Sequence, residues 1–321
     1  MKKVFIISAI LSLSFAAIAQ EEVKRFTDVC YVSTPNPHER QVLDLTLPGS
    51  GKGPFPLLIF IHGGAFMAGS KADVNWTAFS EAPSRGYALA GINYRLASAN
   101  DTVGRFPQGI QDVMAAIRYL RANAEKYQLD PNRFAVSGFS SGGYHTAMIC
   151  VLSGAENDIE DFTLGNTGVS SAVQAAVSWS GLSDLLKLDE QQAENPGIRY
   201  FISDHSKNPP EATYIGGQIT SPAYAATFAR SNPLNYVTVN TPPILMQHAP
   251  NDNVVPWQQS QILVNKINEV ATPGRAIFDA IDNGGHGGPP FNSASNADRI
   301  FRFLDENLTG KYRSPEFVIQ E

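Results

Sequence analysis

The stretch RFAVSGFSSGGYHTAMICVL, residues 133–152, decides the fold. Its apolar start at 133–137 predicts a buried strand, and the apolar run at 144–152 predicts a helix. Between them lies the pentad GFSSG at 138–142, which has the form G-x-S-x-G. A strand, a glycine-flanked turn and a helix in this order place the serine on a sharp, strained turn at the carboxyl edge of a sheet. Ser140 is therefore the candidate nucleophile.

Short apolar runs recur along the chain, with helical patterns between them. Such runs are typical of strands buried on both faces of a parallel sheet. The helical patterns place apolar residues every three or four positions, most clearly at 107–127 and again at 296–308. This alternation predicts an α/β fold with a mostly parallel central sheet flanked by helices. Strands are expected at 26–33, 41–47, 56–61, 87–94, 133–137, 173–180, 244–248 and 275–280.

A second glycine-rich segment, HGGAF at 62–66, directly follows the strand expected at 56–61. Acyl transfer places negative charge on the former carbonyl oxygen, and fixed N–H donors stabilise it. The backbone N–H groups of Gly63, Gly64 and Ser141 are the candidate oxyanion hole, with Ala65 as a further candidate. His62 precedes the nucleophile in the chain, so we interpret it as a structural histidine that fixes this loop.

Two residues near the end of the chain complete a catalytic constellation. Asp252 follows the strand expected at 244–248, and His286 lies between glycines after the last expected strand. The order serine, acid, histidine is the one that G-x-S-x-G proteins of this kind use. His286 would take the proton of Ser140, and Asp252 would orient the imidazole. Asp184, which follows the strand at 173–180, is the alternative acid.

The remaining titratable residues carry weaker cases. Asp279 and Asp282 lie too near His286 in the sequence to be attractive partners for it. Of the other histidines, His145 is expected in the core, His248 at a strand end, and His38 and His205 in surface loops. No C-x-x-C or C-x-x-H spacing is present, so we expect neither a metal nor a cofactor. Cys30 and Cys150 are expected as two buried free thiols.

The first 19 residues resemble a signal peptide. Lys2 and Lys3 precede an apolar stretch, and Ala17-Ile18-Ala19 forms a small-x-small cleavage pattern, so the mature chain is expected to begin at Gln20. The stretch is shorter than the roughly 20 residues that span a bilayer. We expect export to the periplasm or the extracellular space, and no membrane span.

Composition limits the partners of the mature chain. Its 22 basic and 30 acidic residues give a formal charge of −8, which argues against nucleic acid and anionic membranes. Residues 20–321 are expected to form a single domain. Within it, 183–243 is rich in Pro, Gly, Asn and Tyr with weak periodicity, and is expected to form a cap or lid insertion.

Taken together, these motifs resemble the esterase branch of the α/β-hydrolases, which includes the hormone-sensitive-lipase-like and acetylxylan/feruloyl-esterase-like families. The likeness rests on 62–66, on NYRL at 93–96, on LDPNR at 129–133 leading into the pentad, and on SNPL at 231–234, and extends from about residue 40 to 308. Ala65 and Ala249 depart from the glycines that the families carry. The first departure argues against bulky tertiary-alcohol esters.

The resemblance implies an α/β-hydrolase fold and a secreted serine carboxylesterase. Its substrate would be a small-molecule or polysaccharide ester with a short acyl, acetyl or feruloyl group. Tyr200, Tyr214 and Tyr224, with Asn195 and Asn208, suit stacking and hydrogen bonding to sugars, or merely solvate a long loop. A prolyl-oligopeptidase-like peptidase, a non-catalytic binding protein and a long-chain lipase are the alternatives.

Overall fold

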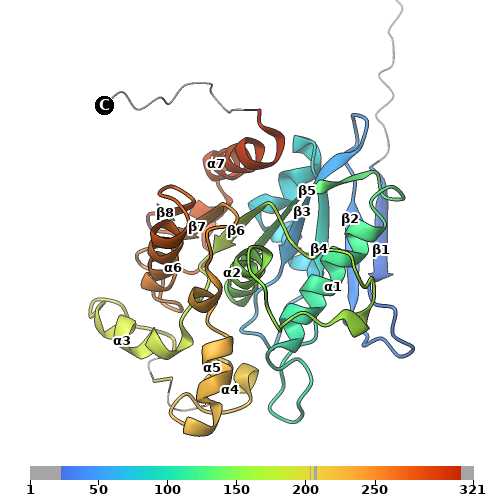
Figure 1. Cartoon of the computed structure of the whole chain (residues 1–321). Coiled ribbons are helices and arrows are strands. Elements are labelled where there is room, and N and C mark those ends of the chain that lie inside the picture. Colours follow the sequence, from blue (N-terminus) through green and yellow to red (C-terminus); the bar gives the residue numbers. More distant parts are fainter. Residues whose placement is uncertain (1–22, 203, 206–207, 312–321) are drawn as a thin grey trace, which may run out of the picture.

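The computed structural model describes residues 23–202, 204–205 and 208–311 (Figure 1). The predicted signal peptide and its cleavage site lie outside the described residues. An eight-stranded sheet runs through the centre in the order β1-β2-β4-β3-β5-β6-β7-β8. Its strands are β1 (Arg25–Cys30), β2 (Val42–Thr46), β3 (Phe55–Ile61), β4 (Ala88–Ile92), β5 (Leu129–Phe139), β6 (Ala175–Trp179), β7 (Ile244–His248) and β8 (Ala276–Ala280).

The sheet is mostly parallel, as the sequence predicts. β1 pairs antiparallel with β2, and β2 pairs antiparallel with β4. All other neighbours, from β4 to β8, are parallel. The carboxyl ends of these six strands therefore meet at one edge of the sheet, where the loops that follow β3, β5, β7 and β8 lie close together.

Central strand β3 shows why the apolar runs are continuous. Every residue of β3 is buried, and alternate side chains enter different cores. Leu57, Ile59 and Ile61 belong to one core cluster, whereas Leu58 and Phe60 belong to the other. A strand that is covered on both faces cannot alternate between apolar and polar residues.

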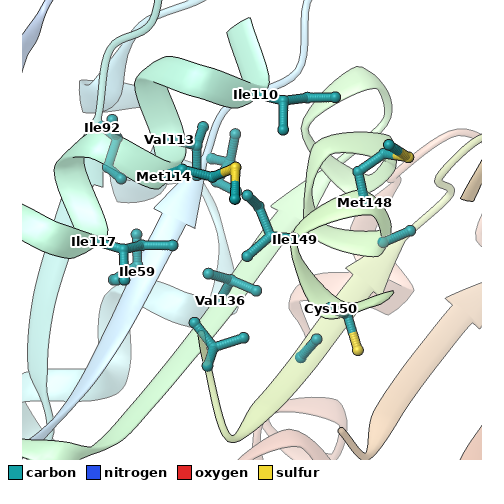
Figure 2. Packing of buried hydrophobic residues seen from close by; sticks show 14 of the residues in the cluster. Ile59, Ile92, Ile110, Val113, Met114, Ile117, Val136, Met148, Ile149 and Cys150 are labelled. Carbon is teal, nitrogen blue, oxygen red and sulfur yellow. The ribbon is translucent and has the colours of Figure 1, made fainter. Parts of the chain in front are cut away.

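Helices cover both faces of the sheet. The first core holds side chains of α1 (Gln108–Ala122), α2 (Ser141–Ser153) and α6 (Gln258–Val270). Figure 2 shows Val113 and Ile117 of α1 and Ile149 of α2 against strand residues such as Ile59 and Val136. The second core holds side chains of η1 (Lys71–Trp76), η2 (Ala78–Arg85) and α7 (Ala294–Leu304).

The described residues of the segment 183–243 form only short helices, which explains its weak periodicity. They are η4 (Leu185–Lys187), α3 (Leu188–Ala193), α4 (Pro210–Ile215), η5 (Pro222–Tyr224), α5 (Ala225–Arg230) and η6 (Pro233–Tyr236). Figure 1 shows α3, α4 and α5 below the sheet and its flanking helices. The remaining short helices are η3 (Phe162–Leu164), η7 (Pro289–Asn292) and η8 (Asp305–Thr309).

Three expectations about exposure are wrong. His205 is buried rather than on the surface, because its backbone N–H and its ring Nδ1 both bind the Asp189 carboxylate. Cys30 is free as expected but exposed, because it ends the edge strand β1; Cys150 is free and buried. Tyr214 is buried and stacks on Phe66, with ring centroids 4.0 Å apart, so its face is not available to a sugar.

Candidate active site

Ser140 occupies a strained turn between β5 and α2. Its φ of 56° and ψ of −121° lie in a region that non-glycine residues rarely adopt, at a cost of about 1–3 kcal/mol. The surroundings hold it there. Its N–H donates to the Trp179 carbonyl at 2.8 Å, and its own carbonyl accepts from Tyr144 N–H at 3.0 Å, which starts α2. The side chain is 8% exposed, and its hydroxyl oxygen approaches His286.

Glycines flank this serine because backbones approach too closely for side chains. A Cβ on Gly138 would run into the Gly142 carbonyl, and a Cβ on Gly142 would run into the carbonyl of Ile61. A Cβ on Gly143 would lie 2.8 Å from the Trp179 carbonyl oxygen. The pentad thus lets the start of α2 pack directly against the ends of β3 and β6.

The predicted nucleophile, base and acid meet at the carboxyl edge of the sheet. His286 Nε2 lies 2.9 Å from Ser140 Oγ, although the two residues are 146 positions apart. His286 Nδ1 lies 2.8 Å from Asp252 Oδ2. A carboxylate only accepts hydrogen bonds, so Nδ1 carries the ring hydrogen and donates it to Asp252, which leaves Nε2 to accept from the Ser140 hydroxyl. The geometry therefore selects the tautomer that a general base needs.

Asp252 is buried and fully occupied by hydrogen bonds. Its Oδ1 accepts from the N–H groups of Val254 at 2.8 Å and Val255 at 2.9 Å. Its Oδ2 faces both His286 and His248 Nε2, the latter at 3.3 Å. Burial raises the pKa of Asp252, but the hydrogen bonds from His248 and His286 outweigh burial and hold it well below its usual range. Asp252 is therefore ionised at neutral pH.

The rival acids lie elsewhere. Asp184 caps η4 by accepting the Leu186 N–H at 3.0 Å. Asp279 pairs with Arg299 at 3.0 Å, and Asp282 is exposed. Of the acids that the sequence leaves open, the structure brings only Asp252 within hydrogen-bond distance of the His286 ring.

The loop of Gly63 and Gly64 lies beside the nucleophile. A Cβ on Gly63 would lie 3.2 Å from Ser140 Cβ. Gly64 has a φ of +112°, and Ala65 and Phe66 also have positive φ, so the loop doubles back on itself. Ser141 is the first residue of α2, so its N–H has no acceptor within the helix. Two of the candidate oxyanion donors, Gly63 and Ser141, therefore lie beside Ser140.

His62, at the start of this loop, is buried. Its Nδ1 lies 2.7 Å from the Gly63 carbonyl oxygen, and its ring stacks on Tyr94 at 4.4 Å. Burial, the largest cause, lowers the pKa of His62 to about 4. The ring is thus neutral at neutral pH, in keeping with the structural role expected for it. His145 is also buried, and burial lowers its pKa to about 3.

A cavity of about 300 Å³ is lined by Gly63, which lies next to Ser140, and most of its other lining residues are not predicted from the sequence. The lining is mostly apolar, and Trp76, which is 81% exposed, forms its rim toward solvent. Its lining residues are Phe60, Gly63, Gly64, Gly69, Asp73, Trp76, Thr77, Phe139, Trp179, Gly287 and Asn292. Asp73 and Trp76 lie on η1 and Asn292 on η7, helices too short to give a periodic signal in the sequence.

Within the described residues, no group of three or more His, Cys, Asp or Glu side chains could hold a metal ion. No helix in this part of the chain is long and apolar enough to cross a membrane.

Solved structures share this architecture. A truncated form of a carbohydrate esterase from gut microbiota superposes with a TM-score of 0.76 at 30% identity, over 91% of this chain and 98% of that one. A bifunctional GH43-CE protein of Bacteroides eggerthii gives a TM-score of 0.75 at 28% identity, over 88% of this chain and 35% of that one. The fold is that of an α/β-hydrolase.

A family model identifies the family within this fold class. The chain belongs to the BD-FAE family, whose model matches residues 43–267. Esterase LipC of Mycobacterium tuberculosis is 29% identical over 234 residues, which is 73% of this chain and 53% of LipC. The probable carboxylic ester hydrolase LipM of the same organism is 28% identical over 232 residues, 72% of this chain and 48% of LipM. The chain thus spans about half the length of these curated relatives.

Proposed function

We propose that the protein is a carboxylic ester hydrolase in which Ser140 is the nucleophile, His286 the general base and acid, and Asp252 the residue that orients His286. The observation that carries the proposal is the continuous chain from Ser140 Oγ to His286 Nε2 at 2.9 Å and from His286 Nδ1 to Asp252 Oδ2 at 2.8 Å. The relatives named as esterases support the same activity.

The reaction has two steps. Ser140 Oγ attacks the ester carbonyl carbon as its proton passes to His286 Nε2, and the carbonyl electron pair moves onto oxygen. The N–H groups of Gly63, Gly64 and Ser141 stabilise that oxyanion. The carbon–oxygen bond to the alcohol then breaks, and His286 protonates the departing alkoxide. Water, deprotonated by His286, attacks the acyl-serine, releases the carboxylic acid and restores Ser140.

For the substrate, we propose an ester side group of a polysaccharide, with a short acyl or an aromatic acyl group. The 300 Å³ cavity beside Ser140 is larger than an acetyl group needs. Trp76 at its rim offers an aromatic face, and Asp73 and Asn292 offer polar groups for hydroxyls. Carbohydrate esterases among the structural neighbours support this substrate class. With the signal peptide expected at 1–19, we propose that the enzyme works after export.

The activity is tested with p-nitrophenyl acetate, butyrate and laurate. Ser140→Ala should lower kcat by at least about 10³-fold, since only the oxyanion donors and substrate binding remain. The matched control is Ser141→Ala, which removes a neighbouring buried hydroxyl but keeps the backbone N–H. It should retain activity. Absence of any ester turnover by the wild type, or equal losses in the two variants, would contradict the assignment.

The substrate class is tested at the rim of the cavity. Trp76→Ala should raise KM for acetylated xylan and for methyl ferulate while leaving p-nitrophenyl acetate turnover nearly unchanged. Phe162→Ala is the control, because Phe162 is a half-exposed aromatic on η3, outside the cavity lining. Unchanged KM for both larger esters would remove Trp76 from substrate binding.

A further inference from the structure

Arg40 lies in the loop before β2, and its side chain contacts both ends of the loop 62–69, which carries Gly63 and Gly64. Its Nη2 lies 3.0 Å from His62 Nε2 and donates to the Gly69 carbonyl at 2.9 Å. Its Nε donates to the Tyr94 carbonyl at 2.9 Å. A guanidinium has donors and no acceptor, so His62 Nε2 must be the acceptor in the first of these contacts.

This contact fixes the tautomer of His62. With Nε2 accepting from Arg40, the ring hydrogen is on Nδ1 and is donated to the Gly63 carbonyl at 2.7 Å. The neutral ring that burial enforces is the form that this arrangement requires. In the other tautomer, the Nδ1 lone pair would face the Gly63 carbonyl oxygen, and the contact would be repulsive.

The Gly63 carbonyl and the Gly64 N–H belong to one peptide unit. The unit is planar and trans, so its C=O and N–H point in opposite directions. Holding the Gly63 oxygen against His62 therefore aims the Gly64 N–H away from His62, and Gly63 itself lies beside Ser140. The ring of His62 thereby fixes the direction of the Gly64 N–H, one of the proposed oxyanion donors.

Arg40 also ties the far end of the loop to its start. Gly69, which ends the loop, lies directly on the loop's beginning, since a Cβ there would run into the Gly63 carbonyl and the His62 ring. Arg40 binds this end through the Gly69 carbonyl. It also binds Tyr94, whose hydroxyl donates to the His62 carbonyl at 3.0 Å.

We propose that Arg40 is a positioning residue for the oxyanion hole: it selects the His62 tautomer and joins the two ends of the loop that carries Gly63 and Gly64. The inference rests on the proposed esterase function of Ser140. Arg40 touches no reacting atom, and its effect passes through His62 and the Gly63–Gly64 peptide. A lysine cannot replace it fully, because one ammonium lacks the planar fork that reaches four acceptors, Asn93 Oδ1 included.

The test is the kinetics of p-nitrophenyl acetate hydrolysis by Arg40→Met and Arg40→Lys. A donor that acts only in the transition state affects kcat rather than KM. Loss of one oxyanion donor costs about 10²–10³-fold in kcat, so misalignment of one should cost about 10- to 100-fold. We expect this loss in Arg40→Met with KM nearly unchanged, and an intermediate kcat in Arg40→Lys.

Arg121→Met is the matched control. Like Arg40, Arg121 donates to several acceptors, the carbonyls of Pro131, Ser170 and Ala172, but it lies at the end of α1, away from the site. Its loss should lower the melting temperature comparably and leave kcat intact.

Each result decides the proposal. Wild-type kcat in both Arg40 variants would overturn it, and so would an equal kcat loss in Arg121→Met. If Arg40→Met does not fold, Arg40→Lys alone decides: a folded Arg40→Lys with wild-type kcat overturns the proposal. A wild type without ester turnover would instead overturn the proposed function, and the role of Arg40 with it.

Discussion

Replacing Asp252 by asparagine should abolish most of the catalysis while leaving the fold in place. Asparagine has the same shape, and its carbonyl oxygen can occupy the Oδ1 position, where it still accepts the N–H groups of Val254 and Val255. Its amide nitrogen must then occupy the Oδ2 position. That nitrogen is a hydrogen-bond donor, and it faces His286 Nδ1, which lies 2.8 Å from Asp252 Oδ2 in the wild-type protein.

The size of the expected kcat loss follows from the tautomer of His286. A donor opposite Nδ1 forces the ring hydrogen of His286 onto Nε2, so Nε2 can no longer accept the proton of Ser140 at 2.9 Å. In serine proteases with the same arrangement, this change lowers kcat by about 10⁴-fold although the geometry is intact. We expect a similar loss here, with little change in KM, because Asp252 does not touch the substrate.

The assay is p-nitrophenyl acetate hydrolysis beside circular-dichroism melting. Asp279→Asn is the control, because this acid is near His286 in the sequence but pairs with Arg299 and Gln247 instead. It should keep wild-type kcat. Asp252→Asn with more than about a tenth of the wild-type kcat would refute the tautomer argument, since a proton acceptor on Nε2 would have survived.

Three further outcomes follow from the same contacts. Burial raises the pKa of Asp252, but its histidine partners lower it below the ordinary value of about 4, so its contribution to stability is present above about pH 4 and is lost as the pH falls below that value. The unfolding free energy, measured with urea from pH 3 to 7, should therefore fall less steeply in acid for Asp252→Asn than for the wild type. Gly142→Ala should lower the unfolding free energy by about 1–3 kcal/mol because its Cβ meets backbone carbonyls, whereas Gly197→Ala, with open space around it, should not. A thiol reagent should label Cys30 in the native protein, but Cys150, whose pKa burial raises to about 12, only after unfolding.

The parts of the site that the sequence predicts are those encoded locally. A strand, a glycine-flanked turn and a helix place Ser140 on a strained turn without any distant contact, and the structure has β5, the turn and α2 in that order. Asp252 and His286 follow parallel strands, whose carboxyl ends must meet at one edge. Chain order and sheet topology were therefore enough to nominate them.

The parts that the sequence does not predict depend on tertiary contacts between unrelated segments. Arg40 is 22 positions from His62 in a loop without a motif, and nothing in its neighbourhood indicates that it faces a glycine loop. Trp76 lies on a short 3-10 helix, where apolar periodicity is absent. His205 and Tyr214 lie among short helices, so their burial could not be read from the pattern of the chain.

The strain in the site indicates how it depends on the sheet. Ser140, Ala65 and Phe66 all have positive φ, a conformation that each would leave if released. What holds Ser140 is its N–H bond to Trp179 at the end of β6, and what holds the loop is its packing against β5 and the Arg40 network. Trp179 ends the fully buried strand β6, and Phe139, against which Gly63 packs, ends the buried part of β5. Substitutions that loosen β3, β5 or β6 should therefore impair the oxyanion hole before the domain unfolds, because relaxation of the strained residues lowers the free energy of a partly opened site.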